Sequence, residues 1–233
     1  MAEMDQTNTL DGAGGATSPP SELEQAQIIC VIGGPGVGKG TQCARLVTDL
    51  GVLHLSVGDL LRAGADKILA KQGIDIVAYM RDGKLVPKET VQGILEDAIV
   101  FNVKAGKTHI LLDGFPRSVD QTKLFEASDC KIKAMLLFQG SRETLLQRVL
   151  NRAKTSGRVD DTEAIFEKRY QGFLDESEEI IRYFEQEEKL VKMDCDRPLA
   201  QIYKEIMELR IFSGGPNEGK GLGSLNGEGG TKT

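Results

Sequence analysis

A glycine-rich stretch that directly follows an apolar run constrains the fold more than any other feature of this chain. The apolar residues 28–32 predict a buried strand, and the sequence GGPGVGKGT at 33–41 comes next and opens a helix. Glycines let backbone N–H groups turn around phosphate oxygens, and the helix directs its positive end at them. Lys39 adds a mobile positive charge. We therefore predict a phosphate-binding loop rather than an ordinary turn, although Gly40 stands where Ser or Thr is usual and the hydroxyl follows at Thr41.

The two ends of the chain differ in composition from its middle. Residues 1–24 contain five acidic residues and no lysine or arginine, and residues 213–233 contain eight glycines. Neither segment has enough apolar side chains to offset the entropy cost of ordering it. We therefore expect disordered tails at 1–24 and 213–233 and one domain at 25–212. The whole chain has a net charge of −6, and the domain without the acidic tail has a net charge near −1. A nucleic-acid-binding face needs an excess of basic residues, so this charge argues against one.

The sequence also bears on where the protein acts. No apolar run approaches the length of a membrane span, and the N-terminus lacks both the basic and apolar regions of a secretory signal and the arginines of a mitochondrial one. We expect a protein of the cytoplasm, or also of the nucleus. The cysteines form no CxxC pair, so we expect reduced thiols rather than metal or redox groups. They are Cys30, Cys43, Cys130 and Cys195.

Strands and helices alternate along the middle of the chain. Further strands are predicted at 52–55, 109–112, 132–138 and 190–193. Helices are predicted at 39–50, 87–106, 141–152, 160–187 and 199–212, with a polar loop at 153–161 and short helical pieces over 57–83 that Gly64, Gly73 and Gly83 interrupt. Short apolar strands alternating with helices predict an α/β fold, a five-stranded parallel sheet covered by helices on both faces. Ligands of such sheets bind beyond the carboxyl ends of the strands.

A second motif, DGFPR, follows the third predicted strand. Asp113 at the carboxyl end of that strand is placed to hold Mg²⁺ through water, or it caps a turn. Arg117 has a planar fork that suits a phosphate, unless it is an ordinary surface residue. Ser118 and Gln121 have the spacing of a capping box, in which the glutamine only closes a helix end.

A third group of candidates is rich in arginine. Arg148 and Arg152 are four residues apart and share one helix face. Arg158 lies in a loop that Gly157 leaves free to fold over a ligand, and Arg169 follows on the next helix. A solvated charged surface is the alternative, and for Arg148 the two interpretations are evenly matched.

Two helix starts are predicted from N-cap patterns. Ser56 with Asp59 begins the pieces over 57–83. Asp160 is expected to cap the helix that follows the polar loop, with Glu163 as its partner. A metal pair with Asp161 is the other interpretation, and Asp161 is also placed to orient an arginine of the loop.

Four motifs together resemble a known family. They are GGPGVGKGTQCARLV at 33–47, HLSVGDLLR at 54–62, DGFPRSVDQ at 113–121 and TSGRVDD at 155–161. The chain is similar to short-lid nucleoside monophosphate kinases of the adenylate kinase and UMP-CMP kinase group, from about residue 28 to residue 211. The family's own phosphate loop also reads GKGT, which accounts for the mismatch at Gly40.

The resemblance implies a P-loop kinase that transfers the γ-phosphoryl group of ATP reversibly to a nucleoside monophosphate, giving ADP and the nucleoside diphosphate. It implies Mg²⁺ as the cofactor, a small acceptor-binding flap over about 56–86 and a short lid over about 153–163. ATP and the nucleoside monophosphate are then the partners, with no nucleic acid and no membrane. A monomer is expected from the resemblance alone.

The resemblance also assigns roles to individual residues. The ATP phosphates would be held by Gly36, Val37, Gly38, Lys39, Gly40 and Thr41, with Arg152 on ATP and the backbone near Arg197 at its adenine side. The acceptor pocket would be lined by Val57, Arg62, Lys84, Leu85, Val86, Gly114, Phe115, Pro116, Arg117, Gln121, Arg158 and Arg169. The catalytic residues would be Lys39, Arg117, Arg152, Arg158 and Arg169. Asp113 would hold Mg²⁺ through water.

Val57 carries most of the information about the acceptor. Adenylate kinases that resemble this chain have Thr there, whose hydroxyl helps read adenine, and pyrimidine kinases usually have Ala. Val57 offers no hydrogen bond and narrows the pocket. The span 63–82, the run 195–197 and Lys154 look more like fungal-type UMP-CMP kinases, whereas Val159 is the adenylate kinase choice. UMP or CMP is the favoured acceptor and AMP the alternative. A nucleotide-binding regulatory protein without efficient turnover is a further alternative.

Overall fold

The computed structural model describes residues 21–82, 84–156 and 161–212, without the side chains of residues 81, 155, 156 and 210. Within them a single five-stranded sheet has the order β2-β3-β1-β4-β5, and every pair of neighbours is parallel. The strands are β1 (Gln27–Gly33), β2 (Leu53–Ser56), β3 (His109–Asp113), β4 (Ile132–Gln139) and β5 (Leu190–Asp194). The predicted fold class, a parallel α/β sheet with five strands, is confirmed.

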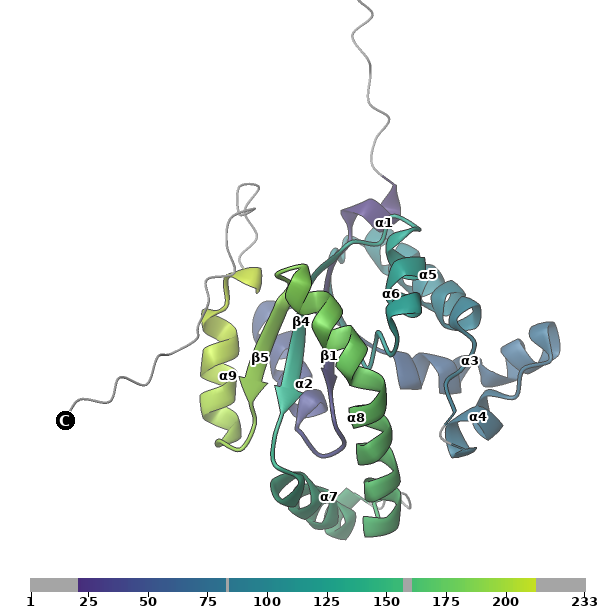
Figure 1. Cartoon of the computed structure of the whole chain (residues 1–233). Helices are drawn as coiled ribbons and strands as arrows, with labels where there is room; N and C mark the ends of the chain where they lie inside the picture. Colours follow the sequence, from purple (N-terminus) through teal and green to yellow (C-terminus); the bar gives the residue numbers. More distant parts are fainter. Residues whose placement is uncertain (1–20, 83, 157–160, 213–233) are drawn as a thin grey trace, which may run out of the picture.

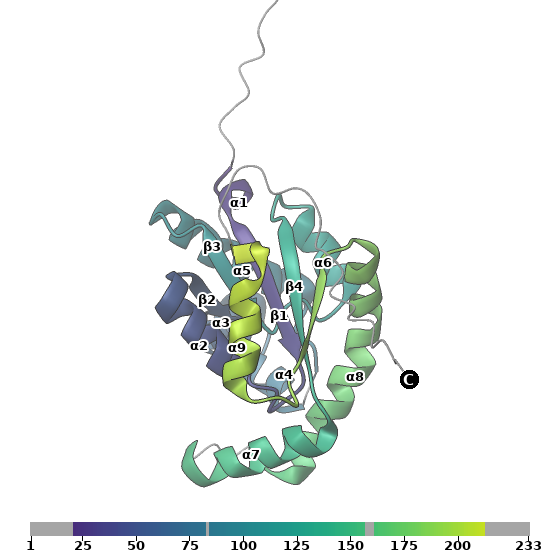
Figure 2. The same cartoon turned by 90° about the vertical axis from the view of Figure 1, so that its left-hand side faces the viewer.

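Helices cover both faces of the sheet, as the sequence predicts (Figures 1 and 2). One face packs against α3 (Val57–Gln72), α5 (Lys88–Lys104), α6 (Val119–Glu126) and the second half of α8 (Glu163–Gln186). The other face packs against α2 (Lys39–Leu50), α7 (Arg142–Ser156), the start of α8 and α9 (Leu199–Glu208), and a separate 3₁₀ turn (Arg210–Phe212) follows α9. No helix in the described part of the chain is both long and apolar enough to cross a bilayer.

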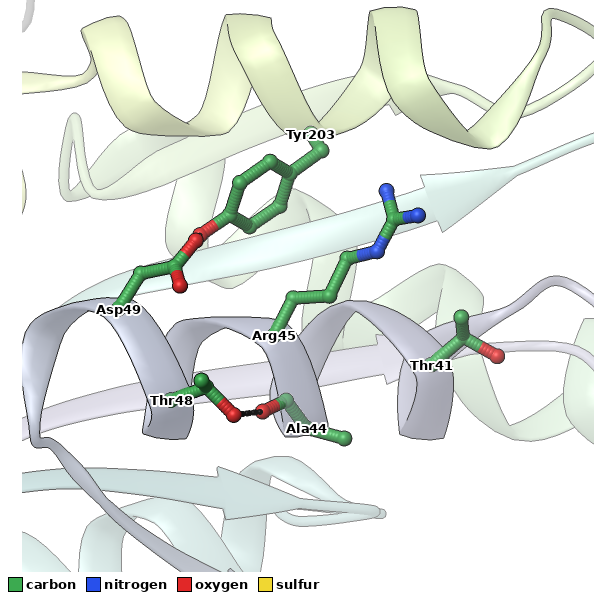
Figure 3. Close-up of a pocket in the computed structure, with 6 residues that line it drawn as sticks. All are labelled: Thr41, Ala44, Arg45, Thr48, Asp49 and Tyr203. Carbon is green, nitrogen blue, oxygen red and sulfur yellow. Dashed lines mark hydrogen bonds between the residues drawn. The ribbon is translucent and has the colours of Figure 1, made fainter.

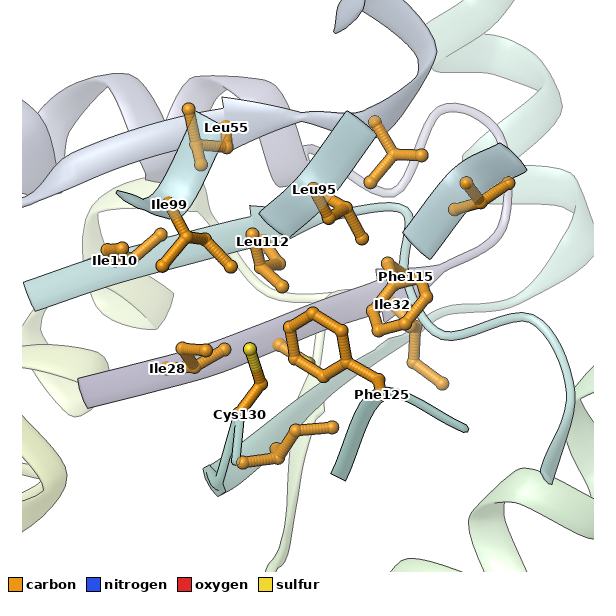
Figure 4. Packing of buried hydrophobic residues seen from close by; sticks show 14 of the residues in the cluster. Ile28, Ile32, Leu55, Leu95, Ile99, Ile110, Leu112, Phe115, Phe125 and Cys130 are labelled. Carbon is orange, nitrogen blue, oxygen red and sulfur yellow. The ribbon is translucent and has the colours of Figure 1, made fainter. Parts of the chain in front are cut away.

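The central strands are apolar throughout because each of their two faces is buried under a layer of helices. In β1, Ile28, Cys30 and Ile32 belong to one hydrophobic cluster, and Ile29 and Val31 belong to the other. The period of two therefore divides a continuous apolar run between two cores. Figure 4 shows the first core, in which side chains of β1 and β3 meet those of α5 and α6.

One predicted break in the helices is absent. The expectation that Gly64 interrupts the segment 57–83 is wrong, because α3 passes through Gly64 and ends only at Gly73, whose φ of +69° forms the C-cap. Leu61 and Ile68 are both buried on the core side of α3, and this packing outweighs the cost of about 1 kcal/mol for a glycine inside a helix. Gly83 lies outside the described residues, between the end of α4 (Ile76–Asp82) and the next segment.

The boundary between α7 and α8 also differs from the prediction. Helix α7 continues to Ser156, so residues 153–156 are helical and not part of a polar loop. The N-cap of α8 is Thr162, whose hydroxyl accepts a hydrogen bond from the N–H of Ile165 at 3.3 Å. The prediction that Asp160 caps this helix is therefore wrong, since Thr162 has the same capping chemistry and stands two residues later. Asp160 itself lies outside the described residues.

A short helix also precedes β1. In α1 (Glu22–Gln25), the Ser21 side chain accepts from the Glu24 N–H at 3.2 Å, and the Glu24 carboxylate accepts from the Ser21 N–H at 2.9 Å. Leu23 packs against the first core. The expectation of a disordered segment through residue 24 therefore fails for residues 21–24, because a capping box and one apolar contact fix them.

Candidate active site

The strands β1 and β3 bring the two phosphate-related motifs to the same edge of the sheet. Val31 of β1 lies opposite Asp113 of β3, and Ser56 of β2 lies opposite the same aspartate. Asp113 therefore stands two residues below the point where β1 turns into the glycine loop at Gly33. Since β1 has β3 on one side and β4 on the other, the loop opens where the strand order reverses, which is where parallel sheets bind ligands.

The glycine loop packs directly on α7. A Cβ built on Gly36 would come within 2.5 Å of the Leu145 carbonyl oxygen and 2.8 Å of Val149 Cγ2, and the φ of Gly36 is +78°. A Cβ on Gly33 would come within 2.6 Å of the Phe138 carbonyl oxygen. Close backbone approach, not only loop flexibility, therefore requires glycine at these two positions.

The first turn of α2 presents backbone N–H groups to a ligand. Its N-cap is Gly38, with φ of +96°, and no side chain of the described residues caps it. Lys39 begins the helix, and its ammonium donates to the carbonyl oxygens of Gly33 at 2.6 Å and Gly34 at 3.1 Å. The lysine is thereby folded across the loop. An uncapped helix start with a positive charge above it is a favourable site for an anion.

Three charged side chains from other segments, and Cys43 of the same helix, act on Lys39. Burial lowers the pKa of Lys39 to about 8, the nearby Asp113 and Cys43 oppose this shift, and the positive charges of Arg117 and Arg169 add to it. These side chains belong to α2, β3, the loop after β3 and α8, so the fold brings them together around the lysine. A ligand with several negative charges would relieve the repulsion among the three cations.

Asp113 is held by a neighbour on β2. The Nε2 atom of His54 lies 3.3 Å from its Oδ2 atom, and both side chains are mostly buried. The sequence reasoning assigned no role to His54, although it stands inside the HLSVGD motif. A carboxylate fixed at this point fits Mg²⁺, which prefers carboxylate oxygens, water and phosphate oxygens, so the assignment of the cation to Asp113 through water agrees with the donor chemistry present.

The segment after β3 positions Arg117 through its backbone. Gly114 donates its N–H to the Val31 carbonyl at 3.0 Å, and the ring of Phe115 packs against Phe125 with centroids 5.0 Å apart. Phe115 and Pro116 are buried, whereas the Arg117 side chain is exposed. Burial raises the pKa of Glu176 on α8, and the positive charge of Arg117 opposes that rise. The arginine therefore extends from an anchored loop toward α8.

Gln121 has a structural role that differs from the one its spacing suggests. Ser118 Oγ accepts from the Gln121 N–H at 3.1 Å, as in a capping box. The Gln121 side chain, however, accepts from the N–H of Arg117 at 2.8 Å and not from that of Ser118. The glutamine is buried and holds the loop that carries the arginine.

Arg152 is fixed by a buried carboxylate. Its Nε and Nη2 atoms donate to the two oxygens of Asp161 at 2.8 and 2.6 Å, and only 1% of the Asp161 side chain is exposed. The sequence reasoning expected Asp161 to orient an arginine of the loop, whereas the structure pairs it with Arg152 of α7. This bidentate pair joins the end of α7 to the start of α8.

The segment expected to lie beside the adenine of ATP, around Arg197, stands between α7 and the start of α9. Arg148 donates from Nη2 to the Arg197 carbonyl oxygen at 3.4 Å, and its Nη1 atom is buried without a hydrogen-bond partner among the described residues. The Arg197 side chain turns away to Glu205 at 2.5 Å and Asp194 at 3.4 Å. The structure thus gives Arg148, for which the sequence left two interpretations open, a fixed place beside the Arg197 backbone.

The expected acceptor residues between positions 57 and 86 separate into a buried pair and an exposed set. Val57 and Val86 are both buried in the first core. Arg62 pairs with Asp59 on its own helix and is 56% exposed, and Lys84 lies 3.8 Å from Asp82 and is 71% exposed. Leu85 is 37% exposed. In this conformation Arg62 and Lys84 do not join the group around Lys39.

Other predicted residues fall outside the gathered group or outside the described chain. Val37 is buried in the second core, and Gly40 and Thr41 are exposed on the first turn of α2. Arg169 is exposed on α8 within electrostatic reach of Lys39. Arg158 lies outside the described residues, so its placement stays a prediction.

A hollow on the outer side of α2 is distinct from this site (Figure 3). It is lined by Thr41, Ala44, Arg45, Thr48 and Asp49 of α2 and by Tyr203 of α9. The Tyr203 hydroxyl bonds to Asp49, and the Arg45 guanidinium carbon lies 5.5 Å from the Tyr203 ring centre. Its residues contact one another, and only Thr41 also belongs to the expected ATP residues. The side chains that line the hollow therefore connect α2 to α9, and we assign them no second phosphate site.

Comparison with known proteins agrees with this geometry. A family model described as adenylate kinase matches residues 31–189. The uridylate kinase of Saccharomyces cerevisiae is 41% identical over 192 residues, which cover 82% of this chain and 94% of that protein. Adenylate kinase isoenzyme 1 of Homo sapiens is 38% identical over 185 residues, covering 79% and 94% of the two chains. UMP-CMP kinase of Danio rerio is 36% identical over 188 residues, covering 78% and 96%. With a phosphate loop, an aspartate and arginines gathered at one sheet edge, this chain belongs to the adenylate kinase family.

Proposed function

We propose that this protein transfers the γ-phosphoryl group of ATP reversibly to UMP or CMP. The observation that carries the proposal is the gathering of Arg117, Arg169 and Asp113 around Lys39 at the mouth of the glycine loop. Three cations and one carboxylate match the charges of two phosphate-bearing ligands and a Mg²⁺ ion. Phosphoryl transfer needs this arrangement more than it needs acid–base chemistry, because positioning and charge neutralisation supply most of the catalysis.

No side chain has to remove a proton from the acceptor. A nucleotide phosphate is already ionised near neutral pH, so its oxygen attacks without a general base. The two histidines of the chain agree with this, because His54 is engaged by Asp113 and His109 lies near the start of β3, at the opposite end of the strand from Asp113. The protein's task is then to hold donor and acceptor in line.

Each residue has a part in this task. The α2 amides and Lys39 hold the donor phosphates, and Arg152, set by Asp161, reaches the transferring group. Arg117 and Arg169 hold the acceptor phosphate, together with Arg62 and Arg158 once the site closes. Asp113 would hold Mg²⁺ through water, and the bound ion would supply neutralisation of the charge that develops on the phosphoryl oxygens. The ammonium of Lys39 can leave the Gly33 and Gly34 carbonyls and follow that charge.

Closure completes the site. We infer that the segments 56–86 and 153–163 act as acceptor flap and lid on the 25–212 domain, because Arg62 and Lys84 are exposed and stand apart from the group around Lys39. Closing would bring them to the acceptor and exclude water, which strengthens every charge interaction and prevents hydrolysis of ATP. A monomer of the cytoplasm, or also of the nucleus, is part of the same proposal, and the four free cysteines in the described structure agree with a reducing compartment.

The acceptor is inferred from Val57 and from the relatives. Val57 is buried at the start of α3 and belongs to the same hydrophobic cluster as Val86. It therefore offers the base an apolar wall and no hydrogen bond. The similarity to a yeast uridylate kinase at 41% identity favours a pyrimidine. Similarity to adenylate kinase isoenzyme 1 at 38% makes AMP the second candidate.

An acceptor panel tests the proposal. ADP formation is measured with UMP, CMP and AMP at fixed ATP and Mg²⁺, for the wild type and for Val57→Thr. We expect kcat/KM for UMP or CMP to exceed that for AMP at least tenfold, and Val57→Thr to reduce this ratio. A preference for AMP would make the protein an adenylate kinase by activity. No ADP with any acceptor would leave a nucleotide-binding regulatory protein.

A further inference from the structure

Three ligand-forming side chains converge beside the glycine loop. Cys43 comes from α2, His54 from β2 and Asp113 from β3, and one ligand atom of each lies within 4.8 Å of the other two. They are separated by 11 and 59 residues in the sequence, and the sheet order places their elements against one another. Cys43 is 1% exposed, and the other two side chains are mostly buried.

The spacing of these atoms is close to that of a tetrahedral zinc site. Bonds of about 2.0–2.2 Å to nitrogen and oxygen and 2.3 Å to sulfur put the ligand atoms about 3.3–3.6 Å apart. The separation between His54 Nε2 and Asp113 Oδ2 is already 3.3 Å. The thiol has to move inward by little more than about 1 Å, which a side-chain rotation on α2 can supply.

The donor set selects the kind of cation. A thiolate and an imidazole suit Zn²⁺, whereas Mg²⁺ requires oxygen ligands in an octahedron. With the thiol proton released to solvent, one thiolate, one neutral imidazole and one carboxylate balance the charge of a divalent ion. The positive charge of Lys39 lies close by and disfavours a second cation. We therefore expect affinity below that of a closed four-ligand structural zinc site.

We propose that Cys43, His54 and Asp113 form a three-ligand site for Zn²⁺, with the fourth position left to water or a phosphate oxygen, and that zinc there inhibits phosphoryl transfer. The inhibition rests on the proposed function, because it follows from Asp113 serving Mg²⁺. A carboxylate bound to zinc no longer orients the water shell of the magnesium ion. The remaining kinase residues stay in place, so removal of zinc restores the enzyme.

Cobalt spectroscopy tests the site independently of catalysis. Co²⁺ is added to the nucleotide-free, full-length protein in excess Mg²⁺, and the thiolate-to-cobalt charge-transfer band is recorded, then titrated away with Zn²⁺. We expect the band in the wild type and in Cys130→Ala, a control that removes an equally buried thiol from the other core. Cys43→Ala should lack the band. His54→Gln should weaken cobalt binding at least tenfold, whereas His109→Gln should not.

The kinase assay tests the consequence. Zn²⁺ should lower the wild-type rate at least tenfold at saturating Mg²⁺ and ATP, and a chelator should restore it. Cys43→Ala should lose this sensitivity when its rate with zinc is compared with its own rate without zinc. Zinc bound to ATP would affect both proteins equally, so a difference between them reports the protein site. Zinc binding without inhibition would overturn the proposed inhibition of phosphoryl transfer and would leave the proposed metal site standing.

Several results would overturn the site itself. These are no charge-transfer band in the wild type, an undiminished band in Cys43→Ala, or equal loss in Cys130→Ala. Should Cys43→Ala not fold, a full-strength band in folded His54→Gln overturns the proposal. A wild type without kinase activity in the absence of zinc would refute the proposed function, and the cobalt spectrum would still decide the metal site.

Discussion

At the scale of single residues, the glycine loop is fixed by its close packing against α7. Gly36 combines a φ of +78° with a site for Cβ only 2.5 Å from a backbone oxygen of α7. The loop therefore cannot accept a side chain without moving away from Leu145 and Val149. Phosphate binding and core packing impose the same residue at this position for two independent physical reasons.

Comparing Gly36→Ala with alanine at an unconstrained glycine tests whether packing and backbone strain, rather than the loss of a glycine as such, require Gly36. We expect the free energy of unfolding to fall by about 2–4 kcal/mol, from backbone strain and overpacking, and ATP affinity to fall at least tenfold. Gly93→Ala is the control, because Gly93 is helical, exposed and has nothing within 4 Å of its Cβ position. It should gain about 0.5–1 kcal/mol. Denaturant unfolding and nucleotide titration measure both, and equal stability of the two variants would refute the packing argument.

Lys39 makes ATP use dependent on pH. Burial lowers its pKa to about 8, with Asp113 and Cys43 opposing the shift and Arg117 and Arg169 adding to it. Below pH 8 the free enzyme carries the charge that binds phosphate, and above pH 8 it loses it. Since the ATP phosphates are fully ionised in this range, the ligand adds no change of its own. We expect kcat/KM for ATP to fall about tenfold per pH unit above pH 8.

A charge that does not titrate provides the control for this profile. Lys39→Arg keeps its charge above pH 12, so its lower kcat/KM should show no decline between pH 8 and pH 10. Steady-state rates across pH 6.5–10, with the protein shown to be folded at each value, give the comparison. A flat wild-type profile would mean that Lys39 keeps its proton in the free enzyme.

At the scale of elements, sequence patterns predicted most boundaries, because buried strands and capped helices have local signatures. The four strands after β1 begin within one residue of the expectation, and the Ser56 cap of α3 is present. Gly64 misled the prediction because tertiary packing of α3 overrides a local penalty. Thr162 was missed as a cap because Asp160 shows a competing pattern two residues earlier.

The site was predictable to a similar extent and for a similar reason. Residues inside contiguous motifs, such as Lys39, Asp113 and Arg117, could be assigned from the resemblance. The pairing of Arg152 with Asp161 and the approach of Cys43 to His54 depend on how helices and strands pack. No local pattern contains that information, because each of these contacts joins separate elements.

The joint between α7 and α8 gives a prediction at this scale. Asp161→Asn removes half of a buried charge pair and leaves the Arg152 guanidinium poorly held. We expect kcat to fall about 10–100-fold and the free energy of unfolding to fall by about 1–3 kcal/mol. Rates and denaturant unfolding measure the two effects.

A second pair between the same helices provides the control. Arg142 and Glu167 also join α7 to α8, but each side chain is 41% exposed. Glu167→Gln should leave both kcat and the thermal midpoint nearly unchanged, because solvent screens an exposed pair. If Glu167→Gln lowered kcat as much as Asp161→Asn, any loosening of the joint would suffice, and the specific orientation of Arg152 would not be the cause.

At the scale of the whole molecule, the basic side chains of the site divide into a gathered group and an exposed group. The cations of α2, α8 and the loop after β3 gather, whereas Arg62 on α3 pairs with its neighbour Asp59 and Lys84 is largely exposed. The like charges of Lys39, Arg117 and Arg169 repel one another. Two bound phosphate groups remove that repulsion, and their negative charge then favours the approach of the remaining basic side chains.

This argument predicts a ligand-dependent closure that can be measured as a distance. Spin labels are placed at Val77→Cys on α4 and Gln147→Cys on α7, both exposed, while the native cysteines are buried. The distance between the labels should shorten when ATP analogue and UMP are both bound, and less with either alone, because each ligand neutralises only part of the charge. Arg62→Ala should weaken the shortening with UMP and raise its KM at least tenfold, while the thermal midpoint stays unchanged, since Arg62 is 56% exposed. An unchanged distance with both ligands bound would mean that Arg62 reaches the acceptor by side-chain motion alone, without movement of α3 and α4.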